Sequence, residues 1–559
     1  MSNKLKKSVL DLSKYTRNEL ESEYIKLYSK YLQAEAKADR YEENFKIAQQ
    51  QRFGKSSEKN IAGQMSLSDY EEFNIFNEAE AVANDDIKEP NLDDAIEKQK
   101  SAEEKKKKRK GKPSRKDLTG LKVKEQEFVL SESEMVCPEC GGPLHFVKKT
   151  THVEIVVEEP KVYVKKYTTS HYACRNCQKN DKGTFVTAPG APKELFRNSP
   201  ASPSVVASDI TKKYSLALPF DRIAKDYEQK GIPITKGNMC KWSIMASDRY
   251  LSPVVDIMED TLMHEAAMHC DETFTRVVNQ DDKDTSSKPY IWVKTTAEYQ
   301  KDHPIAIYKY QPGRSDLDCR EVLGDYDGYV MCDAYTCYES VLHTNKDTGA
   351  PPLKIKPVAC MVHVKRGFVE ALANVEKKDW PKTSAYLATA KIAKIFDIDN
   401  KIKYSTYEER KEKRLKDLKP AMEDFFAWCK EEKELVLPKC KYGDAINYAV
   451  NQEEKAMRLF EDGRLELDNN LAERTVKPFV IGRKNWMFHD TVGGAKASCV
   501  IYSLVQTAKM NNLNVEEYIK YILEECRGKK TLTPKEAKRF LPWSKNLPDY
   551  VKNPAKLEK

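Results

Sequence analysis

The chain has 559 residues, 40% of them hydrophobic, so several folded units of about 150 residues and at least one sizeable core are expected. Its 95 basic and 87 acidic side chains leave a formal net charge of only +8, so any affinity for nucleic acid must come from local clusters. No run approaches the roughly 20 apolar residues of a membrane helix, residues 1–12 lack a secretory apolar core, and the scattered cysteines argue against a disulfide framework, so we expect a cytoplasmic protein without a membrane partner.

An apolar seam runs through the first fifty residues, with members spaced alternately four and three apart. They are Leu20, Tyr24, Leu27, Tyr31, Ala34, Ala38, Tyr41, Phe45 and Ala48. This repeat is typical of a short coiled coil, although its alanines and tyrosines equally suit one helix packed on its own protein. We assign 1–60 to this helical unit and 61–125 to a disordered linker, because an acidic run there precedes a basic run at 105–110.

Two Cys-x-x-Cys pairs mark the next unit, 126–190. They are formed by Cys137 with Cys140 and by Cys174 with Cys177, and alternating, strand-like sequence separates them. Four thiolates in this arrangement suit a closed tetrahedral site for structural Zn²⁺. A thioredoxin-like redox motif is the alternative, but it requires a single pair in a βαβ setting. We therefore predict a zinc-ribbon-like module.

Residues 191–263 have a helical pattern. Two predicted helices, at 221–229 and 235–247, flank the turn at 231–234, an arrangement that resembles a helix-turn-helix. Lys236, Asn238 and Lys241 on the second helix would then contact a DNA groove. A helical connector with an ordinary polar surface has a similar pattern and remains the alternative.

Four strand-like runs follow, at 265–278, 289–296, 305–310 and 328–332, with a helix expected around 315–323. The apolar run 357–364 also favours a buried strand. Three strands in hairpin order, then a helix and a further strand, fit a ribonuclease H-like fold, in which the first and fourth strands are neighbours. The pattern from 366 to 460 is mostly helical and charged, which indicates an insertion into that core.

Three acids occupy positions at which such a fold could bring them together. Asp271 lies in the first strand, Asp333 follows the fourth, and Glu473 opens a helical stretch rich in Arg and Lys. Mg²⁺ prefers oxygen ligands, and two such ions can stabilise both the attacking and the leaving oxygens of a phosphodiester displacement. Each acid also has a purely structural alternative: a solvated strand end, a helix N-cap, and a capping box of Asn470 with Glu473. Glu272 is excluded because neighbours in a strand face opposite sides.

The residues around the third acid form a longer motif. It comprises Asn469-Asn470-Leu471-Ala472-Glu473-Arg474, Lys477-Pro478 and Ile481-Gly482-Arg483-Lys484-Asn485-Trp486. With Asp271-Glu272-Thr273, and with Cys360, His363 and Arg366, it closely resembles the signature of the insertion sequence 66 family of bacterial transposases. The resemblance extends from about residue 20 to about residue 545. Relatives carry glycines after the second acid, whereas Ala334 follows Asp333 here, which puts the turn geometry in question.

The resemblance implies a DDE transposase in which Asp271, Asp333 and Glu473 hold two Mg²⁺ (or Mn²⁺) ions. Such an enzyme cuts DNA at the element's terminal repeats and joins the freed 3′-hydroxyl to target DNA. The DNA-binding set predicted near the acids comprises Arg474, Lys477, Arg483, Lys484 and Trp486, together with His363 and Arg366. Cations would bind phosphates and Trp486 would stack on an unpaired base, unless it anchors the core instead.

The expected architecture is a multidomain α/β plus α protein. The ribonuclease H-like catalytic core comprises 264–365 and 466–530, with a helical insertion at 366–465 and a tail at 531–559. A homo-oligomer and small accessory proteins are the expected partners besides DNA. Two alternatives stay open: a related nuclease that cuts without joining, and a domesticated, non-catalytic DNA-binding protein that contains zinc.

Overall fold

The computed structural model describes residues 16–53, 163, 165–167, 171–173, 185–187, 192–279, 288–373, 375–436 and 440–553. The chain divides into two compact units, one formed by 1–66 with 194–552 and the other by 67–193 with 553–559. In the second unit, β1 (His171–Ala173) pairs antiparallel with β2 (Phe185–Thr187). The predicted linker and all four predicted zinc ligands, Cys137, Cys140, Cys174 and Cys177, lie outside the described residues.

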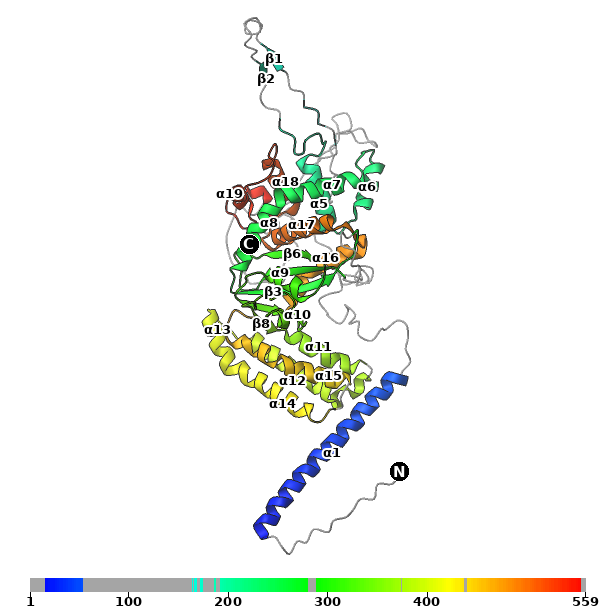
Figure 1. Ribbon diagram of the computed structural model, residues 1–559, viewed down its shortest axis with the longest axis vertical. Helices are drawn as coiled ribbons and strands as arrows, with labels where there is room; N and C mark the ends of the chain where they lie inside the picture. Colours follow the sequence, from blue (N-terminus) through cyan, green and yellow to red (C-terminus); the bar gives the residue numbers. More distant parts are fainter. Residues whose placement is uncertain are drawn as a thin grey trace, which may run out of the picture. The chain divides into compact units, whose positions relative to one another are not determined.

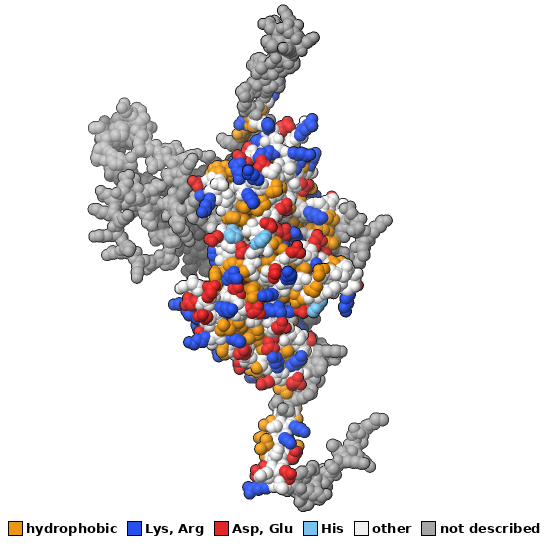
Figure 2. Space-filling model, turned by 60° about the vertical axis from the view of Figure 1, so that its left-hand side comes forward, with side chains coloured by type: hydrophobic (Ala, Val, Ile, Leu, Met, Phe, Trp, Pro, Cys, Tyr) orange, Lys and Arg blue, Asp and Glu red, His pale blue; other side chains and the backbone are white. Residues whose placement is uncertain are grey.

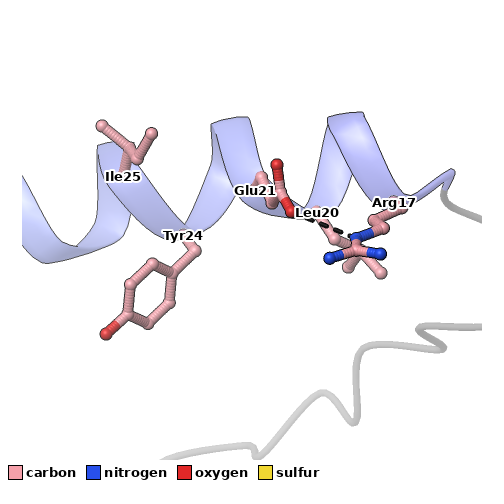
Figure 3. Close-up of a pocket in the computed structure, with 5 residues that line it drawn as sticks. All are labelled: Arg17, Leu20, Glu21, Tyr24 and Ile25. Atoms are coloured by element: carbon pink, nitrogen blue, oxygen red, sulfur yellow. Dashed lines mark hydrogen bonds and ion pairs between the residues drawn. The ribbon is translucent and has the colours of Figure 1, made fainter.

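Helix α1 (Arg17–Phe53) contains the N-terminal apolar seam (Figure 1). Three seam side chains in the first half of the helix are exposed, Leu27 at 69%, Tyr24 at 67% and Tyr31 at 59%. Figure 3 shows the first turns, where Arg17 pairs with Glu21 at 3.2 Å while Tyr24 and Ile25 project from different sides of the helix. The predicted helix is confirmed, and the predicted coiled coil, which needs a second chain, stays a prediction.

A helical region precedes the sheet. Its segments are α5 (Pro203–Ile210), η4 (Thr211–Ser215), α6 (Phe220–Gln229), α7 (Lys236–Ala246), η5 (Ser247–Leu251) and α8 (Ser252–Met263). Thr235 caps α7, since its hydroxyl accepts a hydrogen bond from the Asn238 amide while the Asn238 side chain accepts from the Thr235 amide. The turn before α7 passes through Gly231 at φ +71°. Both predicted helices and the turn between them are therefore present.

A mixed five-stranded sheet forms the centre of the first unit, in the order β6-β5-β3-β7-β8. The strands are β3 (Ala267–Phe274), β5 (Tyr290–Thr296), β6 (Ala306–Gln311), β7 (Tyr329–Cys332) and β8 (Lys356–Ala359). Pairs β3–β5 and β5–β6 are antiparallel, whereas β3–β7 and β7–β8 are parallel. The first and fourth predicted strands, β3 and β7, are neighbours, with α9 (Asp316–Leu323) between β6 and β7 in the chain.

Two of the predicted strands end earlier than expected. The first stops at Phe274, and β4 (Val277–Asn279) instead pairs in parallel with β9 (His489–Thr491). The predicted strand at 357–364 is wrong beyond Ala359, because α11 (Met361–Leu372) begins with Cys360 as its N-cap. The buried positions Met361, Val364 and Phe368 follow a helical period that a continuous apolar run conceals.

The strand register fixes which helices cover each face of the sheet. Tyr308 faces α16 (Asn470–Trp486) and α17 (Val492–Met510): its amide donates to Ser503 Oγ at 2.8 Å and its hydroxyl to the Thr475 carbonyl. On the opposite face, Lys294 donates to Glu259 of α8 at 2.6 Å and to the Val322 carbonyl of α9 at 2.7 Å. Figure 1 shows the sheet between these helices.

A helical bundle follows β8 in the chain and packs around its own core. Besides α11 it contains η6 (Lys377–Lys382), α12 (Ser384–Lys401), α13 (Tyr407–Lys413), η7 (Arg414–Leu418), α14 (Lys419–Lys433), α15 (Lys441–Met457) and η8 (Arg458–Phe460). Phe368, Phe425 and Phe426 are fully buried in that core. This agrees with the mostly helical pattern predicted for the segment.

The chain after α17 forms α18 (Val515–Glu525), α19 (Pro534–Ala537), η9 (Lys538–Phe540) and η10 (Asp549–Val551). In the described part of the chain, no helix has the length and apolarity needed to span a bilayer. Figure 2 shows acidic and basic side chains interspersed over one face. Any basic DNA-binding surface must therefore be sought locally, among named residues.

Candidate active site

The pairing of β3 with β7 brings the first two acids side by side. Ala267 is opposite Tyr329 and His269 is opposite Met331, so the same register continued by two residues places Asp271 level with Asp333. Asp271 shares the face of Val293 and Tyr308, which is the face covered by α16. The neighbouring strands thus position two carboxylates that lie 62 residues apart in the sequence.

Glu473 lies in the first turn of α16, on the same side of the sheet as Asp271. The helix N-cap is Asn469, which makes no side-chain capping bond to α16. Glu473 Oε1 is buried and has no hydrogen-bond partner, so the capping-box alternative for this acid does not hold. Arg366 Nη2 lies 3.6 Å and His363 Nε2 3.7 Å from this oxygen, and both side chains come from α11.

The surroundings of Asp271 and Glu473 raise the pKa of both carboxyls. Burial raises the pKa of Asp271 well above its usual range, and the charges of Glu272, Asp333 and Glu473 raise it further. Burial also raises the pKa of Glu473, against the opposing effect of Arg366, and Asp468 and Asp333 add to the rise. Buried carboxylates that repel one another in this way favour a bound proton or a bound cation.

The donor set fits a hard divalent cation. It offers carboxylate oxygens from β3, from the end of β7 and from α16, including the buried, unbonded Oε1 of Glu473. Within the ranges that the structure describes, no three His, Cys, Asp or Glu side chains are arranged to hold a metal ion as they stand. The three acids would therefore have to draw closer together around an ion.

A second layer of contacts, not foreseen from the sequence, holds Asp333. Arg314 pairs with Glu272 and lies 3.4 Å from Asp333 Oδ2, and its guanidinium stacks 3.4 Å from the Tyr335 ring centroid. Glu272 also accepts a hydrogen bond from the Tyr338 hydroxyl at 2.9 Å. Burial and Asp333 raise the pKa of Glu272 to about 7 despite Arg314. Its contacts with Arg314 and Tyr338 place Glu272 on the face of the sheet opposite α16. No motif in the sequence indicated a role for Arg314.

The start of α16 is attached to β3 and α11. The Asn469 side chain accepts a hydrogen bond from His269 Nδ1 at its Oδ1 (2.9 Å) and donates from its Nδ2 to the Cys270 carbonyl (3.0 Å), while its backbone amide donates to Cys360 Sγ (3.2 Å). His269, 2% exposed, also bonds Glu466. His269 lies two residues before Asp271 and therefore on the same face of β3. This spacing is the sequence feature that could have indicated the hydrogen bonds between His269 and Asn469.

His363 and Arg366, predicted from the sequence as DNA contacts, lie beside the third acid. They lie on successive turns of α11 and both approach Glu473. Burial and the charge of Arg366 lower the pKa of His363 to about 4, so its imidazole is neutral near pH 7. His363 Nδ1 is buried without a hydrogen-bond partner.

The residues of α16 that were predicted to contact DNA include two arginines with side-chain partners in the protein and two lysines at least partly exposed to solvent. Arg474 pairs with Glu298 at 3.1 Å, and Arg483 donates to Thr273 Oγ1 at 3.4 Å. Lys477 is partly exposed and Lys484 is exposed. Trp486, expected to stack on a base, is instead packed 5.5 Å from Phe479 and 4.6 Å from His489, measured between ring centroids. Its core-anchor alternative therefore describes the ring better.

On α7, Lys236 and Lys241 are exposed, as predicted. Asn238 is partly buried, and its side chain caps the helix, accepting from the Thr235 hydroxyl at 2.7 Å. The capping role of Asn238 competes with the predicted contact to a DNA groove. The two lysines remain the exposed cations of this helix at the predicted positions.

Comparison with known proteins identifies the family of the chain. The model described as Transposase IS66 family matches residues 198–497, more than half of the chain, and the model described as Transposase C of IS166 homeodomain matches 40–120. Uncharacterized protein y4jD of Sinorhizobium fredii is 24% identical over 421 residues, which cover 75% of this chain and 80% of that protein. Uncharacterized protein y4hP of the same organism is 24% identical over 409 residues, covering 71% and 72%. The chain therefore belongs to the IS66 family of transposases.

Proposed function

We propose that the chain is a DDE transposase whose catalytic residues are Asp271, Asp333 and Glu473. The observation that carries the proposal is the meeting of these acids from β3, β7 and α16, where Asp333 and Glu473 each raise the pKa of Asp271. Placing several carboxylates together with fewer cations than acids costs free energy, and a purely structural role for these acids does not explain that cost. Membership of a transposase family supports the same conclusion.

The proposal includes a ribonuclease H-like core. Its support is the strand order β6-β5-β3-β7-β8, in which an antiparallel meander of three strands is extended from its first strand by two parallel ones. The helical bundle from α11 to α15 is then the insertion between the second and third acids. Structural Zn²⁺ at the four paired cysteines and a homo-oligomer joined through α1 belong to the same proposal.

The three acids would hold two Mg²⁺ or Mn²⁺ ions, which supply an activated water and stabilise both oxygens at the reacting phosphorus. Arg314 keeps Asp333 in place, and Arg366 with neutral His363 holds Glu473 and faces the incoming phosphate. In the first step, water attacks the phosphodiester at the element's end and the 3′-oxygen leaves as a hydroxyl. In the second, that hydroxyl attacks a target phosphodiester, whose own 3′-oxygen leaves as a hydroxyl, so one phosphodiester is exchanged for another.

A strand-transfer assay with Mg²⁺ on cloned element ends tests the proposal. We expect Asp271→Asn and Glu473→Gln to lower cutting and joining by about 10²-fold or more. The matched control Glu525→Gln, at an exposed acid of α18 paired with Arg539, should leave both unchanged. Cutting without joining by the wild type would indicate a nuclease, and DNA binding with neither activity would indicate a domesticated binding protein. Either result would overturn the transposase assignment.

A further inference from the structure

The strand that carries Asp271 ends in a small exposed surface. Thr273 lies two residues beyond Asp271 on the same strand face, about 6.5 Å further along. Its Oγ1 accepts a hydrogen bond from Arg483, whose guanidinium carbon lies 5.8 Å from the ring centroid of Phe274. Phe274 is 40% exposed at the end of β3, a strand that is buried in its first half and partly exposed in its second. A cation, a hydroxyl and an aromatic ring therefore stand together next to the acids.

Arg483 differs from the other arginines of the site in its partners. Arg314 pairs with Glu272 and Asp333, Arg366 approaches Glu473, and Arg474 pairs with Glu298. Arg483 has no carboxylate within ion-pair distance among the described residues, and its only polar partner there is the Thr273 hydroxyl. The C-terminal carbonyls of α16 offset part of this charge, since Arg483 lies in the last turn. A half-buried guanidinium with no counter-ion suits an anionic ligand.

The aromatic ring available at this place is Phe274. Trp486 is partly buried and is packed against Phe479 and His489, and Lys213 Nζ lies 5.7 Å from its ring centroid, so much of its ring is already in contact with the protein. Phe274 is held by an edge contact with Tyr290, with centroids 6.2 Å apart and planes at 78°, while much of its surface stays open. An aromatic ring fixed beside a cation is the arrangement that binds unpaired nucleotides, by stacking and by phosphate contact.

We propose that Arg483, Thr273 and Phe274 form a binding site for an unpaired nucleotide that flanks the phosphate to be cut. Arg483 binds the phosphate of that nucleotide, Thr273 orients the guanidinium, and Phe274 stacks on the base. The inference rests on the proposed function, because the acids define which phosphate is cut. It also predicts that the terminal base pairs of the DNA are open (frayed) when the end enters the site. Residues of β3 and α16 then bind the unpaired strand.

Fluorescence anisotropy of the full chain in EDTA tests this without any cutting. The probes are two labelled duplexes of the same mixed sequence, one fully paired and one with mismatched terminal base pairs. We expect wild type to bind the frayed duplex more tightly, and Phe274→Leu to reduce that preference about tenfold. Phe274→Tyr, which keeps the ring, should retain the preference. Arg483→Gln should weaken binding of both duplexes and lower the salt dependence by about one ion.

The matched control is Tyr404→Leu in the helical bundle, because Tyr404 is also exposed (42%) and also lies under an arginine, Arg410, at 4.9 Å. Equal affinity of wild type for the two duplexes, or equal effects of Phe274→Leu and Tyr404→Leu, would overturn the inference. These results are distinct from failure of the proposed function, which would appear as absence of cutting and joining in Mg²⁺. Thermal unfolding of each variant shows whether it is folded.

Discussion

Asn469 joins three segments that meet at the candidate active site. Its side chain bonds His269 and the Cys270 carbonyl on the strand of Asp271, and its backbone amide bonds Cys360 at the start of α11. Because Asn469 is also the N-cap of α16, these bonds determine where Glu473 lies relative to Asp271. The positions of the acids thus depend on a neutral amide that touches none of the reacting groups.

Asn469→Ala should therefore lower both stability and cutting. It removes the partner of His269 Nδ1 and the side-chain donor to the Cys270 carbonyl, which costs about 1 to 3 kcal/mol in the free energy of unfolding. With α16 less firmly held, the Mg²⁺ concentration for half-maximal cutting should rise. Urea unfolding and a Mg²⁺ titration of cutting measure the two effects.

Asn511→Ala is the control for this substitution. The Asn511 amide donates to the Pro304 and Thr507 carbonyls, both at 2.8 Å, so its loss also removes two hydrogen bonds. It should lower stability similarly without changing the Mg²⁺ requirement. Identical Mg²⁺ titrations for the two variants would show that Asn469 does not position the acids.

His489 gives the protein a specific sensitivity to acid. It is 7% exposed, and burial, with the charge of Lys213, lowers its pKa to about 3. The unfolded chain takes up a proton near the usual pKa of about 6.5, so stability present above that pH is lost as the pH falls towards 3. At pH 5 this loss is about 2 kcal/mol.

His489→Phe should remove that loss, because His489 Nε2 is buried with no hydrogen-bond partner and a phenyl ring leaves no polar group unsatisfied. Urea unfolding at pH 5 and pH 7 should show a smaller difference for the variant than for wild type. His264→Phe, at an exposed histidine, serves as the control and should keep the wild-type difference. Parallel pH profiles for wild type and His489→Phe would contradict the prediction.

At the scale of elements, the packing of α16 on α17 depends on Gly482. A Cβ at this position would overlap the Tyr502 hydroxyl and approach Trp486 Nε1 to 2.9 Å. Tyr502 is fully buried, so it cannot move aside cheaply. The family motif around Arg483 therefore includes a glycine because two helices approach closely there.

Gly482→Ala should destabilise the protein by about 1 to 3 kcal/mol, although alanine favours a helix more than glycine does. Gly237→Ala in α7 is the matched control, since its Cβ would meet only Thr235 Oγ1 at 3.7 Å. There we expect a gain of about 0.5 to 1 kcal/mol. Thermal or urea unfolding of the two variants should give shifts of opposite sign.

Element types were largely predictable from the sequence, whereas their ends and partners were less so. The strands after Asp271 and the cap at Thr235 follow from alternation and from capping chemistry. The helix from Met361 was missed because an apolar run such as Val358 to Val364 has no period that separates a strand from a buried helix. Only packing against the helical bundle decides between them.

At the scale of the whole molecule, the sequence allowed the three acids to be named but not the contacts that support them. Neighbouring first and fourth strands follow from the order of elements, so the pairing of Asp271 with Asp333 could be predicted. Arg314 could not, because it comes from the loop before α9 and meets Glu272 only after the sheet has formed. Nor could the packing of Trp486 be predicted, because its ring contact with His489 depends on β9, which follows it in the chain.

The N-terminal helix is where we expect the assembly of the whole molecule to be decided. Leu27 and Tyr31 of α1 lie on the predicted seam and are 69% and 59% exposed. Exposed apolar side chains in a regular stripe indicate an association surface. A second copy of α1 would cover them with an identical stripe, whereas no charge pattern in the described turns favours a different partner.

Leu27→Glu with Tyr31→Glu should therefore lower the molecular mass of the full chain in sedimentation, because four carboxylates would face one another in a paired seam. Ser22→Glu with Ser29→Glu adds the same charge on the outer side of α1 and should leave the mass unchanged. A wild type that sediments as a monomer at micromolar concentration would contradict the prediction. So would an oligomer that both pairs of substitutions leave intact, since α1 would then pack on its own chain.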